Sequence, residues 1–160
     1  MKPLQNIENK ILQGADFDCW LENKRPEIPK LVFTNGCFDL IHRGHVFYLA
    51  KAAALGSHLL VALNTDKSVK KIKGDSRPVQ DQLTRAYVMA AFEFVDFVVF
   101  FNEDTPENII RRILPDVLVK GGDYDIENIV GHDIVSRAGG EVKTIDFVKS
   151  FSTSKIIERI

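Results

Sequence analysis

Apolar runs and amphipathic stretches alternate along the chain from Lys30 onward. Short runs rich in Val, Leu and Phe predict β-strands, whereas apolar residues recurring every three or four positions predict helices. Residues 152–154, a run of hydroxyl side chains, are expected to open a last helix that continues to Arg159. Strands are expected over residues 31–34, 58–64, 97–101, 117–120 and 141–145, with helices over 46–55, 82–92, 106–113 and 129–138.

The expected strands show little alternation between apolar and polar residues, which is typical of strands buried on both faces of a parallel sheet. Strands and helices that alternate at this rhythm predict an α/β fold, a doubly wound and Rossmann-like sheet of five parallel strands. In such sheets ligands bind beyond the carboxyl ends of the strands. Gly36, Asn64, Lys120 and Phe147 lie at or just beyond those expected ends, so the functional site is expected there.

The beginning of the chain carries a weaker helical pattern over residues 4–25, which Pro26 and Pro29 end. We therefore expect an N-terminal helical arm over residues 1–29 and one α/β domain over residues 30–160. A chain of 160 residues is long enough to bury about 70% of the surface that it exposes when unfolded.

Charge and composition narrow the class of protein. The formal net charge of −1 gives no support for a nucleic-acid partner. Cys19 and Cys37 do not make a disulfide framework, and the first residues lack the apolar core of a secretory signal. The most apolar stretch, residues 88–101, contains Glu93 and Asp96, so a core segment is expected there and not a membrane span. A cytoplasmic protein without a membrane partner is expected.

The quartet His-Arg-Gly-His at residues 42–45 lies between the first expected strand and the helix that follows. Histidines three residues apart lie on one side of a helix, and a helix N-terminus favours anions. His42 and His45 therefore predict a binding site for a chain of phosphates. Either one taken singly is more often a cap or a packed side chain, and with Cys37 and Asp39 they also have the chemistry of metal ligands. The spacing of these four residues differs from the common zinc patterns, and Cys37 has no nearby partner thiol. We therefore prefer the phosphate-binding interpretation and expect no metal site.

Two further segments predict phosphate contacts, although the chain has neither a P-loop nor a Gly-x-Gly-x-x-Gly motif after the first strand. Residues 152–154 offer more hydroxyl donors than one helix cap requires, so they are expected to hold β- and γ-phosphates. The lysine-rich segment 64–79 is expected to be a loop on the same edge as His42, either solvated or in contact with phosphate. Arg85, on the next expected helix, is expected to point to the mouth of the same phosphate-binding site.

Paired glycines follow the fourth expected strand. Gly121 and Gly122 would let the backbone approach a flat ligand such as a nucleotide base. Asp123 is expected either to accept hydrogen bonds from ribose hydroxyls or to form an ordinary turn.

The pattern Thr-x-Gly-x-Phe-Asp-x-x-His-x-Gly-His over residues 34–45 resembles the signature of the HxGH nucleotidylyltransferase superfamily. Residues 151–154 resemble its Ile-Ser-Thr-Thr element, with Phe151 and Ser154 as departures. Four phrases resemble the bacterial heptose 1-phosphate adenylyltransferase branch of the cytidylyltransferase-like family, and they lie at residues 33–39, 73–79, 103–106 and 115–124. In some bacteria this activity is fused behind a sugar kinase, and the present chain resembles the stand-alone version.

The resemblance implies transfer of AMP from ATP to a heptose 1-phosphate, which gives pyrophosphate and ADP-heptose for lipopolysaccharide synthesis. It also implies Mg²⁺ carried mainly by the ATP phosphates, and a homodimer. The residues it implies are His42, His45 and Lys73 for catalysis, Thr34, Asn35, Gly36, Phe38, Gly44, Lys120, Gly121, Gly122, Asp123, Ser152, Thr153 and Ser154 for the nucleotide, and Asp39, Asp66, Lys71, Arg77 and Arg85 for the acceptor substrate.

Two alternatives remain from the sequence. A cytidylyltransferase acting on glycerol 3-phosphate or a similar phosphorylated alcohol would resemble a branch that carries an arginine before the Ile-Ser-Thr-Thr element, whereas this chain has Phe147-Val148-Lys149-Ser150. A nucleotide-binding module without turnover would not need the intact histidine pair. A purely structural interaction domain leaves both the histidines and the hydroxyl run unexplained.

Overall fold

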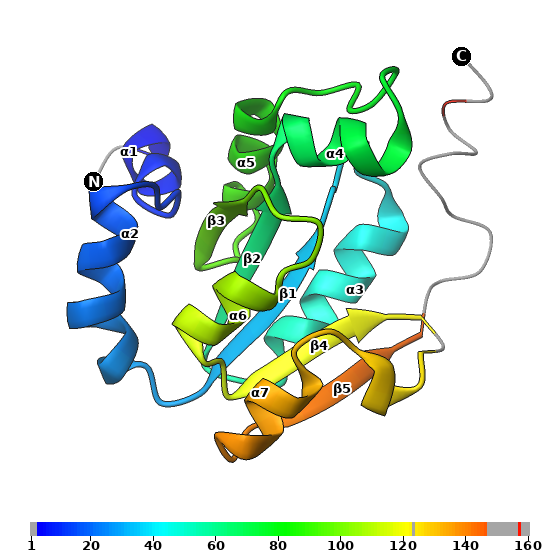
Figure 1. The fold of residues 1–160 in the computed structure, drawn as a ribbon. Helices are drawn as coiled ribbons and strands as arrows, with labels where there is room; N and C mark the ends of the chain where they lie inside the picture. The colour runs from blue at the N-terminus through cyan, green and yellow to red at the C-terminus, as the bar shows by residue number, and fades with distance from the viewer. Residues whose placement is uncertain (1–2, 123, 147–156, 158–160) are drawn as a thin grey trace.

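A parallel sheet of five strands forms the centre of the molecule, seen in a computed structural model that describes residues 3–122, 124–146 and 157 (Figure 1). Its strands stand in the order β3-β2-β1-β4-β5, and every neighbouring pair is parallel. The prediction of a doubly wound α/β sheet is therefore confirmed. The strands are β1 (Leu31–Gly36), β2 (His58–Asn64), β3 (Phe97–Phe101), β4 (Val117–Gly121) and β5 (Glu141–Ile145).

Helices cover both faces of the sheet, which explains why the strands lack alternation. On one face α3 (Arg43–Ala53) and α5 (Gln82–Ala90) pack through residues such as Leu49 and Met89. On the other face α6 (Glu107–Ile113) and α7 (His132–Arg137) pack through Ile110 and Val135. Leu59 to Leu63 of β2 are all fully buried between these layers.

The N-terminal arm wraps around the edge of the sheet at β3. Helix α1 (Pro3–Glu8) packs against α5, and Ile11 then forms a parallel bridge with Val98. After α2 (Ala15–Cys19), a π-helical turn η1 (Trp20–Lys24) and a 3-10 turn η2 (Arg25–Glu27) follow on the α6 face. Phe17 and Trp20 belong to the same hydrophobic core as α6. The arm therefore covers an edge strand that would otherwise expose unpaired backbone groups.

Several element boundaries differ from the predictions. The expected loop after β2 contains a helix, α4 (Asp66–Lys73), which the Thr65 side chain caps by accepting a hydrogen bond from the Ser68 N–H at 3.2 Å. The helix expected over 129–138 is shorter, because the left-handed backbone of Gly131 (φ +93°) separates a 3-10 turn, η3 (Ile126–Asn128), from α7. Of the last expected helix, the structure describes only Ile157.

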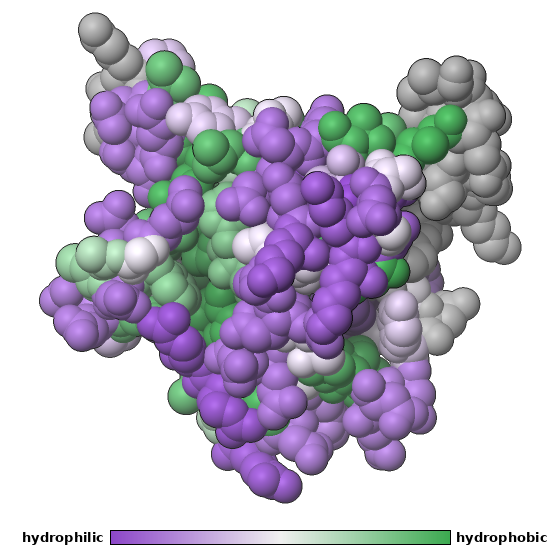
Figure 2. Space-filling model, turned by 45° about the horizontal axis from the view of Figure 1, so that its top comes forward, coloured by the Kyte–Doolittle hydropathy of each residue, from purple (hydrophilic) through white to green (hydrophobic). Residues whose placement is uncertain are grey.

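The carboxyl ends of the strands face the side of the molecule that comes forward in Figure 2. Hydrophilic side chains cover most of this view, and hydrophobic ones gather in a hollow beside the N-terminal helices. Within the described residues, no helix is long and apolar enough to cross a membrane.

Candidate active site

A cavity of about 520 Å³ opens beyond the carboxyl ends of β1, β2 and β4. The strand order reverses between β1 and β4, and this switch point is where ligands bind in doubly wound sheets. The residues that line it at the strand ends and on the neighbouring helices include Asn35, Gly36, Asn64, Lys120, Gly121, His45, Tyr48, Ile72 and Lys73.

The two histidines stand together at the start of α3. His42 is the N-cap residue in extended backbone conformation, and His45 lies in the first turn. Their rings stack with centroids 3.9 Å apart and planes 20° apart. The His42 N–H donates a hydrogen bond to His45 Nδ1 at 3.4 Å, so the proton of a neutral His45 ring sits on Nε2. His45 therefore offers Nε2–H to a ligand in the cavity that it lines.

Both imidazoles are neutral at neutral pH. Burial, together with the nearby positive charges of His42 when protonated and of Lys73, lowers the pKa of His45 to about 4. Burial also lowers the pKa of His42. The pair thus acts through hydrogen-bond donation and the helix N-terminus, while Lys73 supplies the full positive charge beside them.

The residues after β1 hold His45 in place. Phe38 adopts a positive φ of 46°, and its ring lies 5.3 Å from the His45 ring. A Cβ at Gly36 would meet the Phe38 ring at 2.9 Å, so any side chain at this position would displace that ring. Gly44 is buried in the first turn of α3. Of these predicted nucleotide-binding residues, Gly36 and Phe38 line the cavity next to His45.

Thr34, predicted to contact the nucleotide, lies in the core below the cavity. Its side chain is fully buried and its hydroxyl lies 2.6 Å from the Tyr48 hydroxyl, which in turn donates to the Val119 carbonyl at 3.2 Å. The Thr34 side chain therefore supports α3 through Tyr48, and none of its surface is exposed. Burial raises the pKa of Tyr48 to about 12, so its phenol stays protonated in this relay.

Asp39 lines the cavity and binds the segment that follows α4. Its carboxylate accepts hydrogen bonds from Arg77 Nε at 2.7 Å and from the backbone N–H groups of Val79 and Gln80 at 2.9 Å. Burial alone would raise the pKa of Asp39, but these hydrogen bonds and the Arg77 charge lower it below its ordinary value. Among the described residues, Arg77 Nη2 is buried without a hydrogen-bond partner, and Arg77 lines the cavity.

Arg85, expected to bind the acceptor, does not line the cavity in the structure. Its side chain is fully buried, and the guanidinium donates to the carbonyls of Cys37, Asn64 and Gln80 and to Asp66 Oδ1, at 2.7 to 3.1 Å. Arg85 therefore joins the end of β1, the end of β2 and the start of α4. The structure thus places Arg85 behind the cavity wall, where it contacts Cys37 and Asn64, which line the cavity, and is not itself exposed to it.

Other predicted residues lie around the rim. Lys71 forms an exposed ion pair at 2.6 Å with Asp104, which lines the cavity. Asp66 is committed to Arg85. Lys120 donates a hydrogen bond to Asn35 Oδ1 at 2.9 Å, and burial lowers its pKa. The predicted residues Asp123, Ser152, Thr153 and Ser154 lie outside the described part of the chain.

The sequence analysis missed Tyr48, Ile72, Asn128 and Val130 as residues of the site or its margin. Tyr48 follows His45 by three residues, and this helical spacing was a usable signal. No group of three or more His, Cys, Asp or Glu side chains in the described part of the chain is arranged to hold a metal ion.

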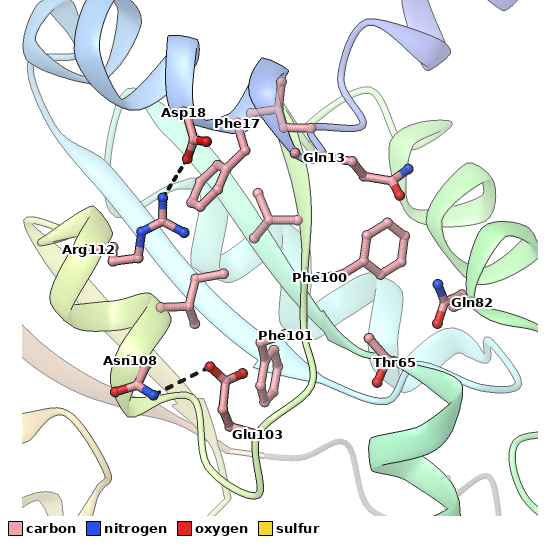
Figure 3. Close-up of a pocket in the computed structure, with 14 residues that line it drawn as sticks. Gln13, Phe17, Asp18, Thr65, Gln82, Phe100, Phe101, Glu103, Asn108 and Arg112 are labelled. Atoms are coloured by element: carbon pink, nitrogen blue, oxygen red, sulfur yellow. Dashed lines mark hydrogen bonds and ion pairs between the residues drawn. The ribbon is translucent and has the colours of Figure 1, made fainter.

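A second cavity, of about 420 Å³, lies between the N-terminal arm, β3 and α6 (Figure 3). Its charged residues are satisfied within the cavity, since Arg112 pairs with Asp18 at 2.6 Å and Glu103 accepts from Asn108 at 3.4 Å. It contains none of the predicted catalytic residues, so the strand-end cavity is the candidate active site.

Comparison with known proteins defines the class. Residues 33–159 match the model of the Cytidylyltransferase-like family, and this chain therefore belongs to that family. The family prediction from the sequence is confirmed.

Particular relatives are proteins named "Bifunctional protein HldE". The chain is 59% identical to the one from Campylobacter jejuni subsp. doylei, over 96% of this chain and 34% of that protein. It is 55% identical to the one from Citrifermentans bemidjiense, over 82% of this chain and 27% of that protein. The chain thus spans about a third of the length of these relatives.

Solved structures share the fold. The lipopolysaccharide core biosynthesis protein from Thermoplasma volcanium superimposes with a TM-score of 0.61 at 24% identity, over 76% of this chain and 98% of that one. A pantoate-beta-alanine ligase from Francisella tularensis gives 0.60 at 11% identity, over 92% of this chain and 75% of that one.

Proposed function

We propose that this protein transfers AMP from ATP to a heptose 1-phosphate, forming ADP-heptose and releasing pyrophosphate in the cytoplasm. The observation that carries the proposal is the stacked histidine pair at the N-terminus of α3, of which His45 lines, together with Lys73, the cavity at the switch point of the sheet. Membership of the Cytidylyltransferase-like family supports nucleotidyl transfer. The phrases at residues 73–79 and 115–124 support the heptose branch.

In the proposed reaction a phosphate oxygen of the acceptor attacks the α-phosphorus of ATP. A bond forms between them, the bond from the α-phosphorus to the oxygen that bridges the α- and β-phosphates breaks, and pyrophosphate leaves with that electron pair. The acceptor phosphate is already ionised at neutral pH, so no general base is needed. Catalysis then rests on positioning and charge neutralisation.

The histidines and nearby cations are suited to this task. His45 Nε2–H and the first turn of α3 would donate to α-phosphate oxygens as negative charge builds up on them. Lys73 is next to His45, and the unpartnered Arg77 Nη2 lies in the same wall, so we assign these two cations to the phosphates. Gly121, Gly122, Asp123 and the hydroxyls at 152–154 remain the predicted nucleotide contacts.

The carboxylates near the cavity suit a magnesium ion that arrives on ATP. Asp39, Asp66 and Asp104 are each engaged by an arginine or a lysine, so none of them is an uncommitted ligand. Mg²⁺ keeps several waters and binds phosphate oxygens, where it would neutralise charge on the nucleotide. The protein's part is then to bind and orient that complex.

We also propose a homodimer, as the family resemblance implies. Val79 and Leu83 are each at least half exposed and would be available to a second copy. Sedimentation velocity should give twice the chain mass of 18.1 kDa, and a single species at the monomer mass would overturn this assignment.

A panel of donors and acceptors tests the function. Pyrophosphate release should be fast with ATP and heptose 1-phosphate and slow with CTP and glycerol 3-phosphate. Faster pyrophosphate release from CTP and glycerol 3-phosphate would overturn the proposed substrates, while membership of the family would still stand. The absence of release from every pair by folded protein would support a nucleotide-binding module instead.

A further inference from the structure

A small side pocket of about 130 Å³ opens off the candidate active site. The two cavities share Asn35, Lys120, Tyr124 and Val130 among their lining residues. Asn128 and the apolar Leu118 and Ile129 line the side pocket alone. It is therefore a branch of the main cavity, and a ligand held at the histidines has a direct way into it.

The side pocket lies on the opposite face of the sheet from the histidines. Leu118 and Lys120 are two residues apart on β4 and so point to the same face, and Leu118 packs with Ile129 in the core under α6 and α7. His45 stands on α3, which covers the other face. A molecule that occupies both places must pass over the carboxyl ends of β1 and β4.

The size of the side pocket limits what enters it. A cavity of about 150 Å³ holds one benzene ring, so a pocket of about 130 Å³ admits at most about six non-hydrogen atoms. A nucleotide base or a complete sugar ring with its substituents has more than that. A heptose differs from a hexose in its exocyclic arm, which has two carbons and two hydroxyl oxygens beyond the ring. That arm has four non-hydrogen atoms, which the pocket accommodates.

The chemistry of the walls matches such an arm. Leu118, Ile129 and Val130 offer apolar contact for its carbons. Asn128, which donates to Asp125 at 3.0 Å, presents an oriented amide for its hydroxyls, while Asn35 and Lys120, predicted to contact the nucleotide, form the wall shared with the main cavity. A site that hydrogen-bonds a substrate hydroxyl discriminates strongly against an analogue that lacks it.

We propose that this side pocket receives the two-carbon exocyclic arm of the acceptor sugar and thereby selects seven-carbon over six-carbon sugar 1-phosphates. The inference rests on the proposed function, and it assigns Asn128 and Val130 as specificity-determining residues. Both belong to the segment around η3, which the fold brings beside β4.

The test compares kcat/KM for manno-heptose 1-phosphate and for mannose 1-phosphate with ATP as donor. In wild type, kcat/KM for the heptose should exceed that for mannose 1-phosphate by at least about tenfold, because one missing carbon group in a fitted pocket typically costs this much. Val130→Phe, which fills the pocket, and Asn128→Leu, which removes the amide at similar volume, should each bring that ratio close to one. The affinity of both variants for ATP, measured by calorimetry, should stay within about twofold of wild type, because the pocket is assigned to the sugar and a lost ATP contact would change the affinity by more.

Ile126→Phe is the matched control. Ile126 is 40% exposed in the same segment and lines neither cavity, so the heptose preference should stay unchanged. Equal efficiency with the two sugars in wild type would overturn the side-pocket assignment while the proposed function stands. Weakened ATP binding in Val130→Phe, with the sugar preference intact, would instead assign the pocket to the nucleotide. No turnover of either sugar by wild type would remove the proposed function, and this inference with it.

Discussion

His45 is held so that one ring nitrogen faces the backbone and the other faces the cavity. Its Nδ1 accepts the His42 N–H, and Nε2–H remains for a ligand. Because burial keeps the ring neutral, the proton stays available for hydrogen bonding across the neutral pH range. In the proposed reaction this donor meets the charge that develops on the α-phosphate.

Two substitutions separate the roles of the two nitrogens. His45→Asn keeps an acceptor near the position of Nδ1 and loses the distal donor, so turnover should fall about 10²–10³-fold. His45→Gln keeps a donor near the position of Nε2 and should lose less. Steady-state assays on both folded variants provide the measurement. Turnover within about threefold of wild type in His45→Asn would contradict a donor role of ordinary size.

The pH dependence of stability reports the burial of the same ring. In the unfolded chain His45 binds a proton near pH 6.5, and in the folded protein only near pH 4. The unfolded state therefore binds more protons between these values, and the free energy of unfolding falls as pH drops from 6.5 to 4. After allowance for solvent screening, the loss should be about 1–2 kcal/mol.

Denaturant titrations of wild type and His45→Asn across this range measure the effect. The variant should show a smaller decrease in unfolding free energy, since it lacks the titrating ring. Asp39 has a lowered pKa and so contributes only at more acidic pH. Parallel pH profiles for the two proteins would mean that His45 is not buried as described.

At the scale of elements, α4 and α5 are joined to the strand ends by Arg85. Its guanidinium binds the carbonyls at the ends of the β1 and β2 segments and the side chain of Asp66 at the start of α4. These hydrogen bonds satisfy the backbone carbonyls at the points where the chain leaves β1 and β2. This arrangement fixes the position of Lys73, at the end of α4, relative to the histidines.

Removal of the Arg85 charge should destabilise the fold. Arg85→Met leaves Asp66 and buried carbonyls without their donor, and we expect a loss of about 3 kcal/mol in unfolding free energy by urea titration. Arg111→Met is the control, because Arg111 is exposed in an i,i+4 pair with Glu107 and should cost less than about 1 kcal/mol. Unchanged stability in Arg85→Met, together with a raised KM for the acceptor, would restore the phosphate role first predicted for it.

These elements show what the sequence could and could not predict. The bounds of β2 and β3 were predicted correctly because apolar runs mark buried parallel strands. The bounds of β5 were also correct, although this edge strand contains Glu141, Lys143 and Thr144 and is only partly buried. Helix α4 was mistaken for a loop because its lysines dominated the interpretation, although Thr65 as a cap and Gly74, with φ of +89°, were signals of its ends.

The site was predictable where one motif carries it and less so where the fold assembles it. His42 and His45 belong to a single turn, and their stacking follows from that spacing. The charge of Arg85 did not reveal that its guanidinium points inward. Asn128 and Val130 are remote in sequence from the histidines, and tertiary packing alone brings them to the margin of the cavity.

At the scale of the whole molecule, the N-terminal arm and the sheet share one core. Trp20 is 6% exposed, and its ring packs edge-on against Phe97 of β3 with centroids 5.0 Å apart. Arg25 ties the arm to the loop before β4 through Asp116 at 3.1 Å. We therefore expect the arm to unfold together with the sheet.

Trp20 is the single tryptophan, so its fluorescence reports on the arm. Fluorescence and far-UV circular dichroism should give coincident unfolding transitions in denaturant. Trp20→Ala should lower the unfolding free energy by about 3–5 kcal/mol, whereas Leu4→Ala, at an exposed position of the arm, should stay within about 0.5 kcal/mol of wild type. A fluorescence transition that precedes the loss of helix signal would mean that the arm folds separately.

The fate of the ATP phosphates tests the central claim most directly. Wild-type protein is incubated with heptose 1-phosphate and with ATP labelled either at the α- or at the γ-phosphorus, and the products are separated. Adenylyl transfer predicts that the α-label enters ADP-heptose and that the γ-label enters pyrophosphate. Transfer of the γ-label to the sugar, or an α-label that never joins the sugar, would contradict the account.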